Sequence, residues 1–341
     1  MATSSSAQDV ERVHAVVARL RDPAAYPERP REVRVRETHM AWVFLTDRYA
    51  YKLKKPVTFS FLDYSTPARR RAACRAELGL NSRLAPWVYL GMTPVLIDGD
   101  GHLRLESAEG APVAWLVKMR RMPDDGFLES AINDGTVTTD RLTEAADLLA
   151  RFFGAQERDP MASADYVASV QATIATDAAA IRESAPGDLG RRADALARRL
   201  DAAIAEWSET IGARGASRVN GHGDLRPEHV YLGPPAAVID CIEFSRAFRL
   251  NDPAEELAFL YLECTRLGAS WVITPFRTAY AEASGDTPPD ALFAIYAAKR
   301  SLLRAKLALW HVGDDGADTA HWHGRAATYL GLGESFVSHV E

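Results

Sequence analysis

The hydrophobic pattern of the chain changes its period near residue 120, and this change limits the folds that the sequence can adopt. Between residues 33 and 118, apolar residues alternate with polar ones in short runs, which is typical of antiparallel strands. Beyond residue 123, apolar residues recur every three or four positions in long Ala-rich segments, which is typical of amphipathic helices. We therefore predict an α+β protein with a mostly β lobe in residues 1–120 and a mainly helical lobe in residues 121–341.

The first part is predicted to be an antiparallel sheet with one inserted helix and one leading helix. The leading helix covers residues 9–20, and the inserted helix covers residues 66–84, capped by Ser65 or Thr66 with Pro67 in its first turn. We expect the packed face of the inserted helix to consist of Ala72, Ala73, Ala76 and Leu80. Strands are predicted over residues 33–35, 40–45, 49–53, 93–97, 102–106 and 113–118, with a hairpin turn at residues 98–101.

The second part is predicted to contain helices interrupted by one hairpin. Two short apolar runs, residues 230–232 and 236–239, are separated by Gly233, Pro234 and Pro235, which favours a turn between two strands. Helices are predicted over residues 126–132, 139–158, 164–183, 188–211, 252–266, 271–283, 290–312 and 319–340.

Composition excludes several classes of protein. The net charge of -6 argues against a general nucleic-acid binder, and no apolar run approaches the roughly 20 residues of a membrane span. The first residues lack the apolar stretch of a secretory signal. Three widely spaced cysteines, Cys74, Cys241 and Cys264, indicate buried thiols rather than a disulfide framework. We therefore expect a cytoplasmic protein with no nucleic-acid partner and no membrane contact.

Charge is divided unequally between the two parts. Residues 1–123 carry 20 Lys and Arg against 13 Asp and Glu, a net charge of +7, whereas residues 124–341 carry 20 against 33, a net charge of -13. This asymmetry is compatible with an anionic nucleotide held by the first part and a cationic or polyhydroxyl substrate held by the second. Solvated helix faces would produce the same totals.

Chemically active side chains gather between residues 220 and 244. This stretch contains His222, Asp224, His229, Asp240 and Glu243, with Asp224 before the predicted hairpin and Asp240 at its end. Two carboxylates brought together by a loop and a strand end suit a magnesium-assisted transfer. One carboxylate would handle a proton, and the other would hold the cation.

Lysines end the third predicted strand. Alternation places Lys52 and Lys54 on one face, opposite Leu53, so one of them can point into the interior. Glu77 lies beside the predicted packed face of the inserted helix. It becomes a candidate functional residue only if a strand lysine lies opposite. The alternative is a solvated, charged sheet edge that blocks aggregation.

Together these motifs resemble the aminoglycoside phosphotransferase family, whose fold is similar to that of protein kinases. The resemblance rests on HGDL at residues 222–225, His229, Ile239-Asp240, and DP followed by ELA within residues 252–258. Residues 36–57 and 61–86 look like the first lobe of an uncharacterised bacterial branch of that family. Some members of the branch carry a further P-loop ATPase domain, but no Gly-x-x-x-x-Gly-Lys-Ser/Thr occurs here, so we expect a stand-alone version.

The resemblance implies roles for individual residues. Asp224 would orient the substrate hydroxyl or accept its proton, and Asp240 would hold Mg²⁺. Lys52, with Lys54 as the alternative, would contact the phosphates of ATP or GTP, and Glu77 would fix that lysine. The backbone of residues 117–119, including Lys118 and Met119, would bind the adenine. His222 would be either catalytic or a scaffold for the loop. The acceptor would be a hydroxyl of a sugar or aminoglycoside-like small molecule.

Two departures from the family pattern stand out. His229 occupies a position that is normally Asn, although imidazole is a poorer magnesium ligand than an amide oxygen. His229 would coordinate the metal, bind a phosphate oxygen, or leave that position to water. In addition, residues 37–40 (Glu-Thr-His-Met) replace a Gly-rich phosphate loop.

Two alternative functions remain at this point. The departures favour a catalytically silent nucleotide-binding module of kinase-like fold. The second alternative is a metal-dependent hydrolase that uses His222, Asp224 and His229, since zinc accepts mixed His and carboxylate ligands.

Overall fold

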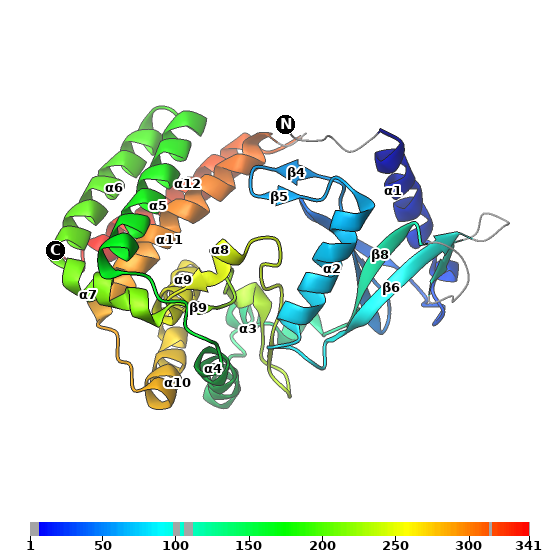
Figure 1. The fold of residues 1–341 in the computed structure, drawn as a ribbon, viewed down its shortest axis with the longest axis horizontal. Helices are drawn as coiled ribbons and strands as arrows, with labels where there is room; N and C mark the ends of the chain where they lie inside the picture. Colours follow the sequence, from blue (N-terminus) through cyan, green and yellow to red (C-terminus); the bar gives the residue numbers. More distant parts are fainter. Residues whose placement is uncertain (1–6, 98–102, 106–111, 314–315, 341) are drawn as a thin grey trace. The chain divides into compact units, whose positions relative to one another are not determined.

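The computed structural model of the chain describes residues 7–97, 103–105, 112–313 and 316–340 (Figure 1). The chain forms two compact units. The first consists of Met1–Gly126 together with Pro235–Ala247, and the second of Phe127–Pro234 together with Phe248–Glu341. The predicted division near residue 120 is therefore accompanied by a short segment, Pro235–Ala247, that returns to the first unit.

The first unit is built on a six-stranded antiparallel sheet with the order β1-β2-β3-β8-β6-β7. Its strands are β1 (Arg34–Glu37), β2 (Ala41–Leu45), β3 (Tyr49–Lys54), β6 (Tyr89–Ile97), β7 (Leu103–Leu105) and β8 (Ala114–Arg120). A small hairpin, β4 (Thr58–Phe59) and β5 (Leu62–Asp63), was not predicted. The other elements are α1 (Ala7–Leu20), η1 (Pro23–Ala25), α2 (Pro67–Asn81), η2 (Asp124–Gly126) and β11 (Ala237–Val238).

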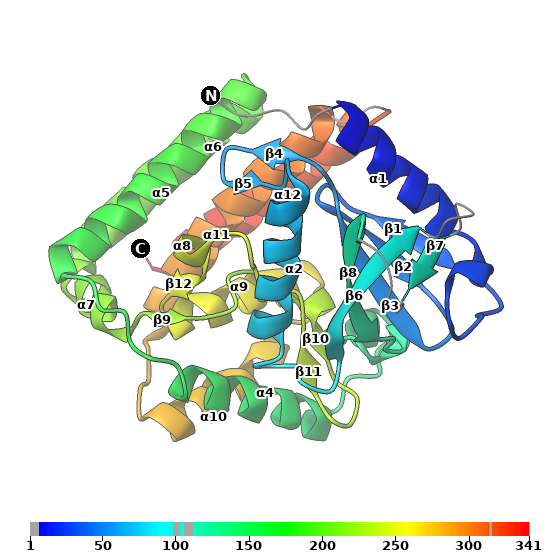
Figure 2. The same cartoon turned by 45° about the vertical axis from the view of Figure 1, so that its right-hand side comes forward.

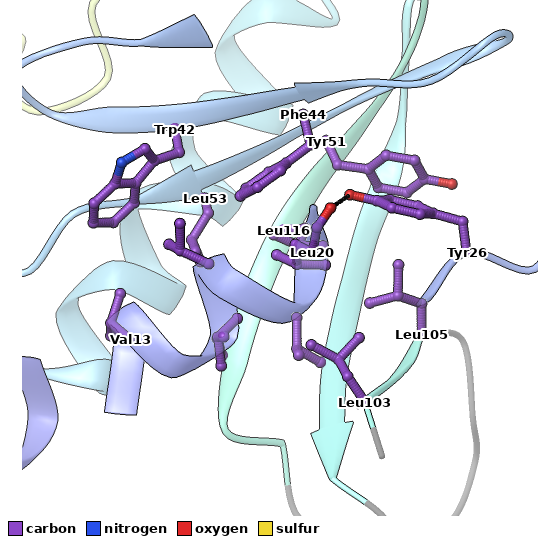
Figure 3. Close-up of a cluster of buried hydrophobic side chains, with 14 residues drawn as sticks. Val13, Leu20, Tyr26, Trp42, Phe44, Tyr51, Leu53, Leu103, Leu105 and Leu116 are labelled. Atoms are coloured by element: carbon purple, nitrogen blue, oxygen red, sulfur yellow. Dashed lines mark hydrogen bonds between the residues drawn. The ribbon is translucent and has the colours of Figure 1, made fainter. Parts of the chain in front are cut away.

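One face of the sheet carries the apolar core of this unit. The register pairs Tyr51 with Lys118 and Leu53 with Leu116, so these side chains share a face. Tyr51, Leu53 and Leu116 are buried there against the apolar stripe of α1 (Figure 3). That stripe consists of Val13, Val16, Val17 and Leu20. The chain after α1 is tied down by Tyr26, whose hydroxyl donates to the carbonyl of Leu20 at 2.6 Å.

The opposite face of the sheet is covered by α2, which Figure 2 shows alongside β6 and β8. Thr66 caps the helix by accepting a hydrogen bond from the Arg69 amide, and Pro67 follows as predicted. The predicted packed face is only partly correct, since Ala73 is buried but the other three predicted residues are not. Ala72 is exposed, and the buried face is formed by Arg70, Ala73, Cys74, Glu77 and Asn81. The helix is rotated because Glu77 finds cationic partners on the sheet, which an apolar pattern does not reveal.

The second unit is mainly helical, as predicted. Its helices are α3 (Leu128–Asn133), α4 (Thr139–Gly154), α5 (Ser163–Ser184), α6 (Asp188–Glu206), α7 (Ser208–Ala213), α9 (Pro253–Arg266), α10 (Ile273–Ser284), α11 (Asp290–Trp310) and α12 (Thr319–Val337). The helix predicted over residues 188–211 is two helices, because the chain leaves helical geometry at Trp207. Short 3-10 turns are η3 (Arg214–Ser217), η4 (Pro227–His229), η5 (Ser270–Val272) and η6 (His311–Gly313), and α8 covers Arg246–Arg249.

A short ribbon supports the loop that contains Asp224. β9 (Val219–Asn220) pairs antiparallel with β12 (Leu250–Asn251), so the chain enters this loop beside the start of α9. The two runs predicted as hairpin strands are present as β10 (Val230–Tyr231) and β11, and they belong to different units. The turn predicted at residues 98–101 lies outside the described residues. Within the described ranges, no helix is both long and apolar enough to cross a bilayer.

Candidate functional site

Lys52 lies at the centre of an ion-pair cluster in the first unit. Its Nζ is 2.9 Å from Oε1 of Glu77 on α2 and 2.6 Å from Oδ1 of Asp240. The three residues come from a strand, a helix and the returning segment, which are far apart in the sequence. The structure thus brings together three of the residues that were singled out for nucleotide and metal binding.

Lys54 occupies the next position on the same face of β3 and extends this cluster inward. Its Nζ contacts the other oxygen of Glu77 and Oε1 of Glu243, and the Tyr64 hydroxyl donates to Glu243. The side chain of Lys54 is 2% exposed, whereas Lys52 is 13% and Asp240 is 45% exposed. Only the Lys52 and Asp240 end of this described cluster is therefore open to solvent, which favours Lys52 over Lys54 as the group that meets a ligand.

Both lysines are held in their charged form. Burial alone would lower the pKa of Lys52, but the carboxylates of Asp240, Glu77 and Glu243 raise it well above its ordinary value. Burial also acts to lower the pKa of Lys54, which Glu243 and Glu77 raise. Conversely, burial acts to raise the pKa of Glu243, and the two lysines lower it. The cluster therefore offers a fixed positive charge beside an exposed carboxylate.

Asp240 adopts an unusual backbone conformation. Its φ of +63° lies in the left-handed region, which costs a non-glycine residue roughly 1–3 kcal/mol and is concentrated at functional sites. Neighbouring groups fix the segment: the Asp240 amide donates to the Tyr89 hydroxyl at 3.2 Å, and the Cys241 amide donates to Oδ1 of Asn81 at 2.8 Å. The carboxylate is thus aimed by its surroundings rather than by local preference.

The adenine contact that the resemblance implied involves the backbone of Lys118 and Met119. Both lie inside β8, which pairs with β3 on one side and β6 on the other, so their backbone groups belong to the sheet ladders. The side chain of Lys118 is on the opposite face from Lys52, with Nζ 4.3 Å from the centre of the Tyr49 ring. Met119 pairs with Ala50 and shares the Lys52 face, so its side chain, not its backbone, is the part that faces this cluster.

Glu256 on α9 holds the loop that contains Asp224 through two hydrogen bonds. The Gly223 amide donates to Oε1 of Glu256 at 2.8 Å, and the His222 amide donates to Oε2 at 3.3 Å. Gly223 has a φ of +86°, and a Cβ on Gly221 would lie 2.8 Å from Glu256 Oε1. Glycine is therefore required on both sides of His222. Glu256 belongs to the sequence motif at residues 252–258, but its spacing there does not reveal this role.

The two histidines of the loop hold backbone groups. His222 is fully buried, and its Nδ1 accepts a hydrogen bond from the Asp224 amide at 3.2 Å. His229 donates from Nδ1 to the carbonyl of Asp224 at 2.8 Å, and its Nε2 lies 3.4 Å from the Arg226 guanidinium. This arrangement favours the scaffold alternative for His222. Nε2 of His229 lies beside the Arg226 guanidinium, a cation that disfavours a metal ion at that nitrogen.

Arg226 is a residue of this loop that sequence analysis missed. Its guanidinium is 2.9 Å from Oδ2 of Asp224 and also contacts Glu228. Burial acts to raise the pKa of Asp224, but Arg226, His229 and Arg304 lower it to about 2. Asp224, with 26% of its side chain exposed, is therefore an ionised and accessible carboxylate. An arginine two residues after the candidate catalytic acid was the available signal.

The donor groups present fit magnesium better than zinc. Among the residues that the structure describes, no three His, Cys, Asp or Glu side chains are arranged to hold a metal ion. Catalytic zinc sites use three protein ligands, so the hydrolase alternative gains no support. Magnesium is usually bound by one or two carboxylates together with substrate phosphates and water. The exposed carboxylate of Asp240 beside Lys52 fits that pattern.

The turn between β1 and β2 carries no glycine-rich loop. Thr38 closes this turn, since its amide donates to the carbonyl of Ala41 at 2.9 Å and its Oγ1 accepts from the Ala41 amide at 3.0 Å. These backbone groups are satisfied within the turn, which agrees with the predicted departure from the family pattern.

Comparison with known proteins identifies uncharacterised relatives in sequence and a shared fold among solved structures. No protein-family model matches the chain. Uncharacterised proteins of Mycobacterium tuberculosis (strain ATCC 25618 / H37Rv) and Mycobacterium bovis (strain ATCC BAA-935 / AF2122/97) are 34% identical to it over 282 residues, or 80% of this chain. The chain spans about half the length of these curated relatives, since the match covers 54% of each.

Solved structures resemble the chain over nearly its whole length. A choline/ethanolamine kinase family protein from Mesorhizobium loti has a TM-score of 0.54 at 14% identity, with 96% of this chain and 99% of that chain covered. Choline kinase LicA from Streptococcus pneumoniae has a TM-score of 0.52 at 17% identity, covering 88% and 94%. A glucosamine kinase in complex with glucosamine, ADP and inorganic phosphate has a TM-score of 0.50 at 16% identity, covering 89% and 79%. The predicted kinase-like α+β fold is confirmed.

Proposed function

We propose that this chain is a small-molecule phosphotransferase, similar to the aminoglycoside phosphotransferases, that moves the γ-phosphate of ATP or GTP to a hydroxyl of a small acceptor. The observation that carries the proposal is the pairing of Lys52 with both Glu77 and Asp240. A fixed cation beside a metal-binding carboxylate is what phosphoryl transfer needs in order to hold the phosphates. The kinase-like fold supports the same conclusion.

Lys52 and Asp240 divide the work on the nucleotide phosphates. Lys52 carries a permanent positive charge, and Glu77 keeps it in place when Asp240 turns to a metal. Asp240 presents an exposed hard oxygen as the protein ligand for magnesium. A magnesium ion held by Asp240 would neutralise charge on the nucleotide phosphates.

Asp224 acts on the acceptor hydroxyl. Because its pKa is lowered to about 2, it is a weak base, and its main task is to accept a hydrogen bond and orient the nucleophile. Such a role suits a loose transition state, in which the proton leaves late. Arg226 lies against this carboxylate and supplies permanent positive charge near the transferring group. His222 and His229 position the loop, as their backbone hydrogen bonds indicate.

We also propose an adenine contact near the end of β8. The Met119 side chain shares the face of Lys52 and offers an apolar surface. The last register pair of β3 with β8 is Tyr49 with Arg120, and the Arg121 amide donates to Arg48. We therefore propose that the segment starting at Met122 supplies the backbone hydrogen bonds to the nucleotide base.

The acceptor is expected to be a small alcohol or sugar. Structures of similar fold are described as kinases of choline, ethanolamine and glucosamine, all of which carry a nitrogen beside a hydroxyl. The net charge of -13 over residues 124–341 agrees with a cationic acceptor. Amino alcohols, amino sugars and aminoglycosides form the first panel to test.

Calorimetric titration of ATP with magnesium into the wild type and into Asp240→Ala tests this proposal. We expect magnesium-dependent binding in the wild type and its loss in the variant. We also expect ADP release with at least one acceptor, which Asp224→Asn should lower about 10²- to 10⁴-fold. An absence of nucleotide binding with magnesium, manganese or calcium would overturn the proposal.

A catalytically silent nucleotide-binding module is the second candidate. Two observations favour it: the closed turn at Thr38, and the position of His229, whose Nε2 lies beside the Arg226 guanidinium. Binding of ATP with magnesium but no turnover over the whole panel would select this candidate.

A further inference from the structure

We infer that Lys54 and Glu243 form a positioning pair that holds Asp240 in its metal-binding conformation. This inference rests on the proposed function, since the metal-binding role of Asp240 is part of it. Lys54 and Glu243 are positioning residues and do not themselves contact the nucleotide.

Two ion pairs, Lys52 with Asp240 and Lys54 with Glu243, have matching spacing along β3 and along the returning segment. Lys52 and Lys54 are two residues apart on one face of β3, so their Cα atoms are about 6.5 Å apart. Asp240 and Glu243 are three residues apart in the returning segment, and each contacts one of these lysines. Glu77 joins the two pairs, with one oxygen on each lysine. The segment is thereby aligned along the strand at two points.

The two ion pairs differ in how deeply they are buried. The side chains of Lys54 and Glu243 are 2% and 7% exposed, and Glu243 also accepts from the Tyr64 hydroxyl. The ring of Phe244, the next residue, packs on Phe61 with centroids 5.4 Å apart. The inner end of the segment, at Glu243 and Phe244, is therefore anchored by a buried ion pair and by ring packing.

The outer end depends on that anchor. Asp240 is 45% exposed and has the left-handed φ of +63°. Asp240 contacts Lys52 through an ion pair, which a nucleotide would share, and its amide donates a 3.2 Å hydrogen bond to the Tyr89 hydroxyl. When Lys52 turns to phosphate, the buried pair of Lys54 with Glu243 continues to hold the segment and keeps Asp240 aimed.

The test uses a variant that removes both members of the pair and leaves Glu77 with its remaining partner, Lys52. Replacement of a buried ion pair by apolar residues is often neutral for stability, so Lys54→Met/Glu243→Met is expected to fold. Lys55→Met is the matched control, because the adjacent Lys55 pairs with the more exposed Glu37 on the same sheet. Hydrogen–deuterium exchange of residues 240–244 and calorimetry with ADP, with and without magnesium, are measured on the full chain.

We expect faster exchange in residues 240–244 and a magnesium-dependent affinity for ADP about 10- to 100-fold weaker in the double variant, as for other residues that orient metal ligands. Binding of ADP in the presence of EDTA is expected to be unchanged, since Lys52 remains, and Lys55→Met is expected to behave as the wild type. Exchange or magnesium-dependent affinity equal to that of the wild type in a folded double variant would overturn the inference. If the wild type binds no nucleotide, the proposed function fails, and the exchange result alone decides whether the pair positions Asp240.

Discussion

The two charged clusters of this protein prepare groups of opposite sign. In the first unit, the carboxylates around Lys52 raise the pKa of a buried amine against the effect of burial. In the second unit, Arg226, His229 and Arg304 lower the pKa of Asp224 to about 2, again against the effect of burial. One cluster therefore fixes a cation and the other fixes an anion. Phosphoryl transfer needs one of each, a cation for the phosphates and an anion for the attacking hydroxyl.

The clusters also differ in how they are assembled. Most of the second cluster comes from one continuous loop, residues 222–229, with Glu256 beneath it. The first cluster joins β3, α2 and a segment that is 188 positions further along the chain than Lys52. Local sequence can specify the second, whereas only the folded sheet brings the first together.

The largest expected effects come from replacing one carboxylate in each cluster, Asp224 or Asp240. Asp224→Asn keeps the shape of the side chain but removes its charge, so turnover should fall about 10²- to 10⁴-fold while nucleotide affinity is retained. Asp240→Ala should instead abolish magnesium-dependent binding. Steady-state ADP release and calorimetry measure the two effects. Equal losses of binding in both variants would show that the clusters do not divide the work in this way.

Within the first cluster, replacement of Lys54 should mainly lower stability, and replacement of Lys52 should mainly affect nucleotide binding. Lys54→Met leaves Glu243 and part of Glu77 buried without a cation, which should lower the free energy of unfolding by about 3–5 kcal/mol. Lys52→Met should lower it less, because Glu77 keeps Lys54, but should abolish nucleotide binding. Urea denaturation and calorimetry check these outcomes.

Lys55→Met is the control for that pair of variants, since partly exposed ion pairs contribute only about 0–1 kcal/mol. A larger loss of stability in Lys52→Met than in Lys54→Met would contradict the assignment of Lys54 to the buried end.

Periodicity was sufficient to predict most elements of the fold. The alternation in β2, β3 and β8 and the helical spacing in α4, α5, α9 and α11 indicated the correct type of element, because each buries one continuous apolar face. The face of α2 was mispredicted in part, since Glu77 is buried by two lysines that lie on a strand. A charged residue at the centre of a packed face can be recognised only when its partner is known.

The candidate site was predicted from the resemblance more than from spacing. Asp224, Asp240, Lys52 and Glu77 were singled out, and the structure shows the last three in contact. Their catalytic roles remain predictions. The adenine contact implied for Lys118 and Met119 also remains a prediction, and the sheet pairing on both sides of these residues cannot be seen in a single strand. Arg226 and Glu256 were missed because they act on the loop through side-chain contacts.

A smaller effect is expected from crowding the loop that contains Asp224. In Gly221→Ala the new methyl group would lie 2.8 Å from Glu256 Oε1 and 3.1 Å from its Cδ, so the carboxylate that holds the loop must move. We expect a loss of about 1–3 kcal/mol in the free energy of unfolding, together with slower turnover. Gly79→Ala in α2 is the control, since no atom lies within 4 Å of its new Cβ. Wild-type turnover in Gly221→Ala would show that Glu256 does not set the loop geometry.

The smallest effect concerns the pH at which the second cluster loses its anion. The pKa of Asp224 is about 2, below the roughly 3.9 of an unfolded Asp, so its ionised form stabilises the fold above about pH 4. That contribution is lost as the pH falls from about 4 towards 2. Arg226→Met removes the nearest cation while burial remains, so the pKa of Asp224 should rise. The acid limb of kcat/KM should then move to higher pH, whereas Arg226→Lys, which keeps the charge, should move it less. An acid limb that is the same in Arg226→Met and the wild type would mean that Arg226 does not set the charge of Asp224.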